Sequence, residues 1–241
     1  MKKADPNAVV DAFRSRVNAS LADWRAIDAA VTAQASSADR LRLRRRAASD
    51  SFLALVIAWE SFLSSWVVAS VNRAPEAAAQ RLTERLTAHA TETLNVPEAV
   101  LSKSLLATSH LSLDTVRGIL DSRGYNTTVN DHAALVKLSG RWLSGPYKVA
   151  ADGITAYEFS PALIGRLLRN ALAHESDAAL QEVNRRARGA GVKAPFRVSR
   201  ARDLDVRSWR AYLFQVPAGE TRHRVELFHQ EYDDLAASLR T

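Results

Sequence analysis

The apolar run from Phe52 to Val71 constrains the fold of this chain more than any other feature. It is long enough to span a bilayer, and it follows the basic cluster RLRLRRR at residues 40–46. However, Glu60 lies near its centre, and inserting a carboxylate there costs roughly 2 to 3 kcal/mol. On a helix the large apolar side chains share one face, while small residues such as Ala54 and Ala58 form a separate stripe that admits a close neighbour. We therefore expect a central bundle helix rather than a membrane span, with Glu60 paired to an arginine.

Most of the remaining chain shows the three- and four-residue apolar spacing of amphipathic helices. The predicted helices cover residues 8–34, 39–72, 75–93, 97–108, 112–123, 131–143, 160–188 and 221–240. Two short stretches favour strands instead: residues 147–159, which contain an Asp152-Gly153 turn, and residues 212–216. The predicted fold class is therefore mainly α, a helical bundle with at most a small β-hairpin.

Length and composition favour a single soluble domain over residues 1–241. The chain has 241 residues, of which 47% are apolar, and this is ample to bury a core. It has no cysteine, so disulfides and thiolate metal sites are excluded. The amino-terminal residues lack the apolar segment of an export signal. Together these features favour a cytoplasmic protein.

The formal net charge of +7 is concentrated in one segment, residues 185–210. Such an excess of positive charge suits a partner rich in phosphate, as does the cluster at residues 40–46. A solvated loop and a solvated helix face are the alternative interpretations. We expect residues 185–210 to form a basic, mobile loop. Its candidate phosphate-binding residues are Arg185, Arg186, Arg188, Lys193, Arg197, Arg200 and Arg202.

Three polar residues, Arg169, Asn170 and His174, interrupt the helix predicted for residues 160–188. On a straight helix His174 lies within the apolar arc and Asn170 borders it, whereas Arg169 points nearly the opposite way. Five residues separate Arg169 from His174, which places them about 140° apart around the axis. The two side chains can serve one site in two ways. Either the helix ends or distorts near His174, or two copies of the segment meet in a symmetric dimer.

The order of these residues resembles the signature of the HEPN superfamily. That signature is an arginine, a polar residue, and a histidine after a spacer of four to six residues; here four residues separate Arg169 from His174. The surroundings are similar too: the aromatic-rich WESFL, then LSLDTVRGILDSRGYN, then LIGRLLRNALAH. The resemblance covers roughly residues 45–190. It implies a HEPN-type helical bundle with a helical insertion at residues 75–159.

The resemblance also implies a chemistry. HEPN proteins that retain the motif are typically metal-independent endoribonucleases, in which the RNA 2′-hydroxyl attacks the adjacent phosphate. By this resemblance Arg169 would clamp the phosphate, His174 would act as acid and base, Asn170 would orient them, and Glu60 would give support. The expected partners are an RNA substrate, a second copy in a homodimer, and an antitoxin or defence-complex protein, with no metal, other cofactor or membrane. The expected role is a toxin or an antiviral-defence effector.

Two alternatives accompany this prediction. A second match to the loose motif, formed by Arg222, His223 and His229, occurs in the last predicted helix; we interpret both histidines as surface residues, with His223 placed to contact RNA. We also interpret the carboxylates of residues 231–234 as solvated, which argues against a two-metal nuclease.

The alternative function is a noncatalytic helical module that binds RNA or a protein through its basic segments. A third, weaker option is a helical scaffold held by a partner, in which the motif is purely structural.

Overall fold

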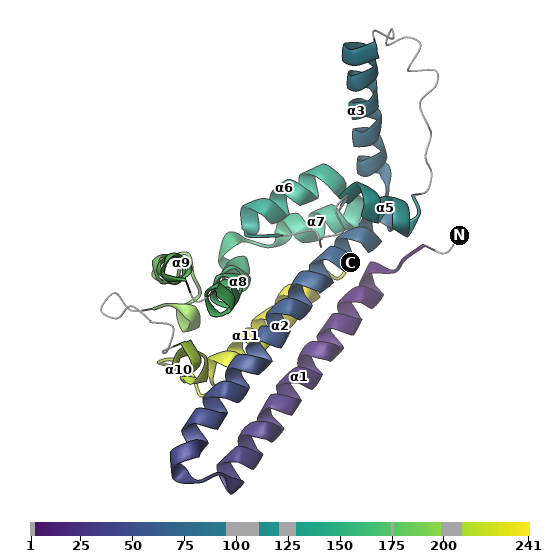
Figure 1. The fold of residues 1–241 in the computed structure, drawn as a ribbon. Helices are drawn as coiled ribbons and strands as arrows, with labels where there is room; N and C mark the ends of the chain where they lie inside the picture. The colour runs from purple at the N-terminus through teal and green to yellow at the C-terminus, as the bar shows by residue number, and fades with distance from the viewer. Residues whose placement is uncertain (1–2, 95–110, 121–128, 175, 199–208) are drawn as a thin grey trace.

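The fold is mainly α, as predicted, and the described part of the chain contains no strand (Figure 1). The computed structural model describes residues 3–94, 111–120, 129–174, 176–198 and 209–241. Within these residues the helices are α1 (Pro6–Gln34), α2 (Ser37–Arg73), α3 (Glu76–Leu94), α5 (Leu113–Leu120), α6 (His132–Trp142), α7 (Gly145–Gly153), α8 (Ala156–His174), α9 (Asp177–Ala187), the short 3-10 helix η1 (Ala194–Phe196), α10 (Trp209–Phe214) and α11 (Arg224–Ser238). The helix predicted for residues 97–108 lies outside the described residues.

The long helices α1 and α2 form an antiparallel hairpin, and α11 packs along both (Figure 1). Aromatic contacts join the pair: the Phe13 and Phe62 rings stack with centroids 4.4 Å apart, and the Trp59 ring lies 5.6 Å from Phe13. The turn between the helices is capped by Ser36, whose side chain accepts a hydrogen bond from the Asp39 backbone. The core therefore begins as a hairpin closed by the last helix of the chain.

Helix α2 holds the centre of the bundle, as its apolar run predicts. By length and composition it is the one helix in the described ranges that could cross a membrane, but 61% of its apolar window is buried inside the protein. Its large face is buried, and its small residues Ala54 and Ala58 lie beside Val17 and Ser20 of α1. The close neighbour expected on the small-residue stripe is thus a helix of the same chain.

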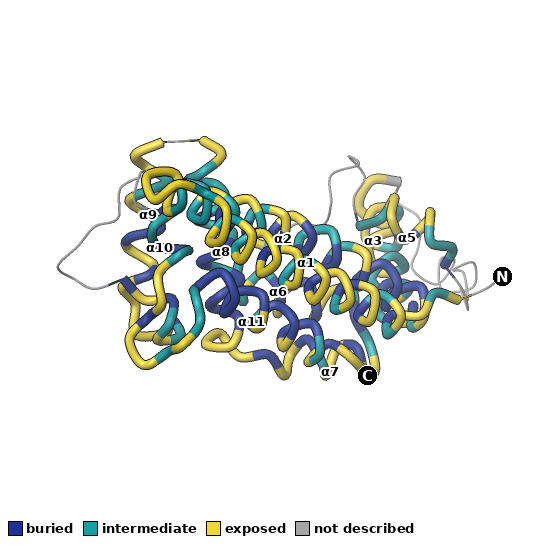
Figure 2. Tube along the Cα trace, turned by 90° about the horizontal axis from the view of Figure 1, so that it is seen from below, coloured by how far each residue is buried: buried dark blue, intermediate teal, exposed yellow. Residues whose placement is uncertain are grey.

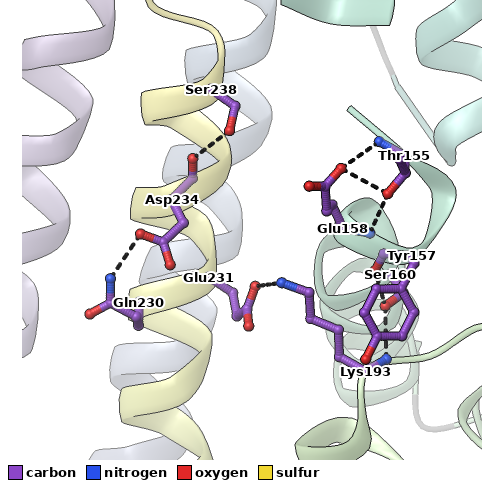
Figure 3. Close-up of polar contacts among 9 residues, drawn as sticks. All are labelled: Thr155, Tyr157, Glu158, Ser160, Lys193, Gln230, Glu231, Asp234 and Ser238. Atoms are coloured by element: carbon purple, nitrogen blue, oxygen red, sulfur yellow. Dashed lines mark hydrogen bonds and ion pairs between the residues drawn. The ribbon is translucent and has the colours of Figure 1, made fainter. Parts of the chain in front are cut away.

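Ion pairs tie α1 to α11, and they correct one prediction about carboxylates. Asp233 accepts two hydrogen bonds from Arg14, both 2.9 Å long, and its side chain is only 12% exposed. Glu226 accepts from Arg25 at 2.8 Å. Glu231 is likewise paired, with Lys193 at 2.5 Å (Figure 3). The expectation of solvated carboxylates at residues 231–234 is therefore wrong for Glu231 and Asp233.

Helices α6 to α9 form a second group that packs on α2 and α11. Figure 2 shows α11 as largely buried, whereas exposed residues lie on the outer turns of α1 and α9. The expected strands at residues 147–159 and 212–216 are absent: α7 and the start of α8 occupy the first stretch, and α10 ends in the second. Capping explains the first error, because the Thr155 backbone N–H donates to Glu158 Oε2 at 2.7 Å and the Glu158 backbone N–H donates to Thr155 Oγ1 at 3.2 Å (Figure 3). This reciprocal capping starts α8 where a strand was expected.

The helix predicted for residues 160–188 is in fact two helices. Helix α8 ends at His174, and α9 begins at Asp177 with Ser176 as its N-cap, which accepts from Ala179 at 3.2 Å. Of the two arrangements considered for the polar motif, a helix end near His174 is therefore observed. Helix α8 itself is continuous from Ala156 to His174, so it keeps Arg169 and His174 in helical register.

Candidate functional site

A pocket of about 210 Å³ lies between α2 and α8. Helix α2 contributes Trp59 and Glu60 to its lining, and α8 contributes Arg166, Arg169 and Asn170. The remaining walls are mostly apolar and come from the same two helices and the residues before α6. The pocket thus gathers charged and amide groups against an aromatic wall, and it includes two of the three motif residues.

Arg169 lines this pocket and is held there by two contacts. Its Nη1 donates to Asn170 Oδ1 at 2.9 Å, and its Nη2 donates to Glu60 Oε2 at 3.3 Å. The expectation that Arg169 points away from the packed face is wrong, because the guanidinium reaches back towards α2. The expected pairing of Glu60 with an arginine is confirmed. Since both side chains are about one-third exposed, the pair contributes at most about 1 kcal/mol, and its main effect is to orient Arg169.

Arg166 is a pocket residue that the sequence analysis missed. It lies one helical turn before Arg169 and Asn170, and its Nε donates to the Asn130 carbonyl at 2.8 Å. Burial lowers the pKa of its guanidinium, which nevertheless stays charged at neutral pH. The spacing of three and four residues from Arg169 and Asn170 is the signal that would have found it.

His174 lies at the end of α8, away from the pocket lining. It is exposed, and no described residue makes a hydrogen bond or an ion pair with it. The expectation that it lies within the buried arc is wrong, because the helix ends there and the described residues leave His174 exposed, although Ala171 in the same turn is buried. Since α8 is regular from Arg169 to His174, the Cβ atoms of the two residues leave the helix about 140° apart around its axis. One chain therefore does not bring them together around a single small group.

The structure describes the basic segment that begins at Arg185 as far as residue 198. Arg185 and Arg186 belong to α9 and both pair with Glu182 of the same helix. Arg188 follows as the exposed C-cap residue. The predicted loop is therefore a helix end in this part, with three arginines on its surface.

Beyond the helix end, two basic side chains are used internally. Lys193 binds Glu231 at 2.5 Å, and its backbone N–H donates to Ser160 Oγ at 3.1 Å (Figure 3). Arg197 donates to the carbonyls of Val192 and Ala190. These contacts give Lys193 and Arg197 partners within the chain, and their assignment as phosphate ligands stays a prediction. Arg200 and Arg202 lie outside the described residues.

The second motif match, at residues 222–229, is structural. His229 is fully buried: its Nδ1 donates to the Val225 carbonyl at 2.8 Å, and its Nε2 lies 3.2 Å from Ser20 Oγ. Burial lowers the pKa of His229, so the ring is neutral. His223 is half-buried and stacks on Phe214 with centroids 4.3 Å apart. The interpretation of both histidines as surface residues is wrong. Because His229 is buried, the match at residues 222–229 is not an alternative site to the motif at residues 169–174.

Comparisons with known proteins add no family. No protein-family model matches the chain, and searches of curated proteins and of solved structures found no match either. In the described ranges no three histidine or carboxylate side chains are grouped to hold a metal ion. A proposal for the function therefore rests on the geometry of the pocket and of α8.

Proposed function

We propose that this protein is a metal-independent endoribonuclease of the HEPN type, completed by a second copy of the chain. One observation carries the proposal: Glu60 and Asn170 hold Arg169 at a pocket, while the exposed His174, five residues later on the same helix, has no described partner. An arginine fixed by a carboxylate and an amide is oriented before substrate arrives. An exposed histidine at a helix end is accessible to a group presented by another molecule.

These residue types suit cleavage of an RNA phosphodiester. The 2′-oxygen forms a bond to phosphorus, and the bond from phosphorus to the 5′-oxygen breaks. Histidine accepts the 2′-hydroxyl proton or donates a proton to the leaving 5′-oxygen. The planar donors of Arg169 stabilise the charge that develops on the phosphoryl oxygens. The products carry a 2′,3′-cyclic phosphate and a 5′-hydroxyl. DNA is not a substrate, because it lacks the 2′-hydroxyl that attacks.

The divergence of Arg169 and His174 on α8 supports a dimeric site. In a two-fold symmetric dimer centred near α8, Arg169 of one copy faces His174 of the other, and two equivalent sites form. Such an enzyme needs no cofactor, so a partner protein is the natural means of restraint. A toxin or an antiviral-defence effector held by an antitoxin or defence complex fits this requirement.

The test is cleavage of labelled total RNA in EDTA by wild type and by the His174→Ala and Arg169→Ala variants. We expect cyclic phosphate ends from wild type and a loss of about 10²- to 10⁴-fold in either variant. His89→Ala, which alters an exposed histidine on α3, and Arg240→Ala, which alters an exposed arginine beyond α11, are matched controls that should retain activity. Cleavage that needs a metal or survives His174→Ala would contradict the proposal. RNA binding without cleavage would favour the noncatalytic module.

A further inference from the structure

Arg166 is the pocket arginine whose two terminal nitrogens both lack a described partner. Only its Nε has a described partner, the Asn130 carbonyl, and no described residue accepts from its Nη1 or Nη2. Arg169, by contrast, uses one N–H of each terminal nitrogen for Asn170 and Glu60, and its remaining N–H groups are left for the reacting phosphate. The contact to Asn130 fixes the plane of the Arg166 guanidinium. The N–H groups of Nη1 and Nη2 are therefore oriented and open to bind both oxygens of a phosphate.

The charges that line the pocket favour a monoanion. Two guanidinium groups, Arg166 and Arg169, face one carboxylate, Glu60. Asp131 and Arg186 act on Arg166 from outside the pocket, and their effects on its charge oppose each other. Because Glu60 is paired with Arg169, Arg166 carries the unbalanced positive charge of the lining, and this charge matches the single negative charge of one further phosphodiester group.

Partial burial of Arg166 strengthens the attraction between its unbalanced charge and an anion. Arg166 is half-buried against the apolar walls, and the loss of water disfavours its charged form. An anion that binds there restores the lost solvation, and its attraction to the guanidinium is stronger than it would be at a fully exposed arginine. Exposed arginines elsewhere on the surface, such as Arg240, lack this environment.

We infer that Arg166 binds a second phosphate of the RNA strand, adjacent to the phosphate that Arg169 holds. This inference rests on the proposed function, since it assigns the path of the same substrate. Residues three apart on a helix have Cβ atoms about 5 to 6 Å apart, so the two arginines are spaced to hold successive phosphates of one strand. The strand then runs along α8 through the pocket, and Arg166 fixes its register relative to His174 of the partner copy.

The experiment measures binding of a fluorescent, fully 2′-O-methylated RNA oligonucleotide, which has no 2′-hydroxyl to attack and cannot be cleaved by the proposed route. The dissociation constant is measured for wild type and for Arg166→Gln across a range of salt concentrations. Loss of one phosphate contact should weaken binding about tenfold or more and reduce the slope of log K against log salt by about 0.7. Arg240→Gln should leave the slope at the wild-type value. Arg166→Lys should keep the slope but recover only part of the affinity, because a lysine lacks the planar fork.

The inference is overturned if wild type does not bind the oligonucleotide, or if Arg166→Gln behaves like Arg240→Gln while retaining the wild-type unfolding midpoint. Its failure is distinguishable from failure of the proposed function. Normal, His174-dependent cleavage together with unchanged binding by Arg166→Gln would reject only the second phosphate site. Absence of cleavage by wild type, with Arg166-dependent binding intact, would reject only the nuclease.

Discussion

The contact between Gly165 and Tyr232 shows how closely α8 approaches α11. Tyr232 is fully buried, and its hydroxyl has no hydrogen-bond partner among the described residues. A Cβ atom added to Gly165 would lie 2.3 Å from that hydroxyl oxygen and 3.3 Å from the ring carbon that bears it. Glycine is therefore required here for space, and the approach it permits helps to set the position of the pocket-lining residue Arg166.

The Gly165→Ala substitution should consequently lower the free energy of unfolding by about 1 to 3 kcal/mol, through overpacking. Tyr232→Phe should be neutral or stabilising, since it removes a buried hydroxyl that lacks a partner. In the Tyr232→Phe background the cost of Gly165→Ala should be largely relieved, because the atom that clashes is gone and alanine favours helix. Urea unfolding of the four proteins measures this coupling. Additive effects of the two substitutions would contradict it.

At the residue scale the sequence identified part of the site. Its polar motif included Arg169 and Asn170, which line the pocket. It also predicted that Glu60 pairs with an arginine, because a carboxylate inside an apolar helix needs a cation nearby. It misplaced Arg169 and His174, because helical angles do not show how far a long arginine reaches or where the packing over a helix ends. Arg166 was missed for the same reason: which turn of α8 faces α2 is a property of tertiary packing.

At the scale of elements, α11 depends on a neutral histidine at its interface with α1 and α2. The Nε2 atom of His229 lies within 3.3 Å of hydroxyl oxygens from both helices, Ser20 and Ser51. Burial is the main cause that lowers the pKa of His229, although the Val225 carbonyl and Glu226 act in the opposite direction. The unfolded chain therefore binds a proton at this residue more readily than the folded protein does.

Stability should fall as the pH drops below about 6.5, the ordinary pKa of an unfolded histidine. The contribution of His229 is complete above that pH, and it is lost by up to about 1.4 kcal/mol per pH unit until the lower folded-state pKa is reached. Urea unfolding of wild type and His229→Gln at pH 7.5 and 5.0 measures it. The difference in stability between the two pH values should be smaller in the variant, and an equal difference would show that His229 does not cause it.

The helices themselves were largely predictable from the sequence. Apolar periodicity placed α1, α2, α3, α6 and α11 to within a few residues, because their apolar residues recur at the helical period. The errors occurred where local capping overrides periodicity. Thr155 with Glu158 begins α8, and Ser176 begins α9, where the sequence analysis had expected a strand and an uninterrupted helix.

On the scale of the whole molecule, α8 carries its two groups of candidate site residues on faces that point in different directions. Arg169 and Arg166 line the pocket against α2, while His174 is exposed at the helix end. Helical angles alone predicted that the two residues diverge, but they assigned the buried and the exposed face the wrong way round. What the sequence did not supply is the position of a second copy, because an interface depends on surfaces from several elements. The central claim of the proposed mechanism is that each chain carries half of two equivalent sites.

Activity of a defined heterodimer tests that claim most directly. Arg169→Ala and His174→Ala chains with different affinity tags are coexpressed, and the dimer that carries both tags is isolated and assayed for RNA cleavage in EDTA. Each homodimer should be inactive. The heterodimer should recover roughly half the wild-type rate per dimer, because one of its two sites combines the intact Arg169 of one chain with the intact His174 of the other. A heterodimer as inactive as either homodimer, beside an active wild-type enzyme, would contradict the shared site.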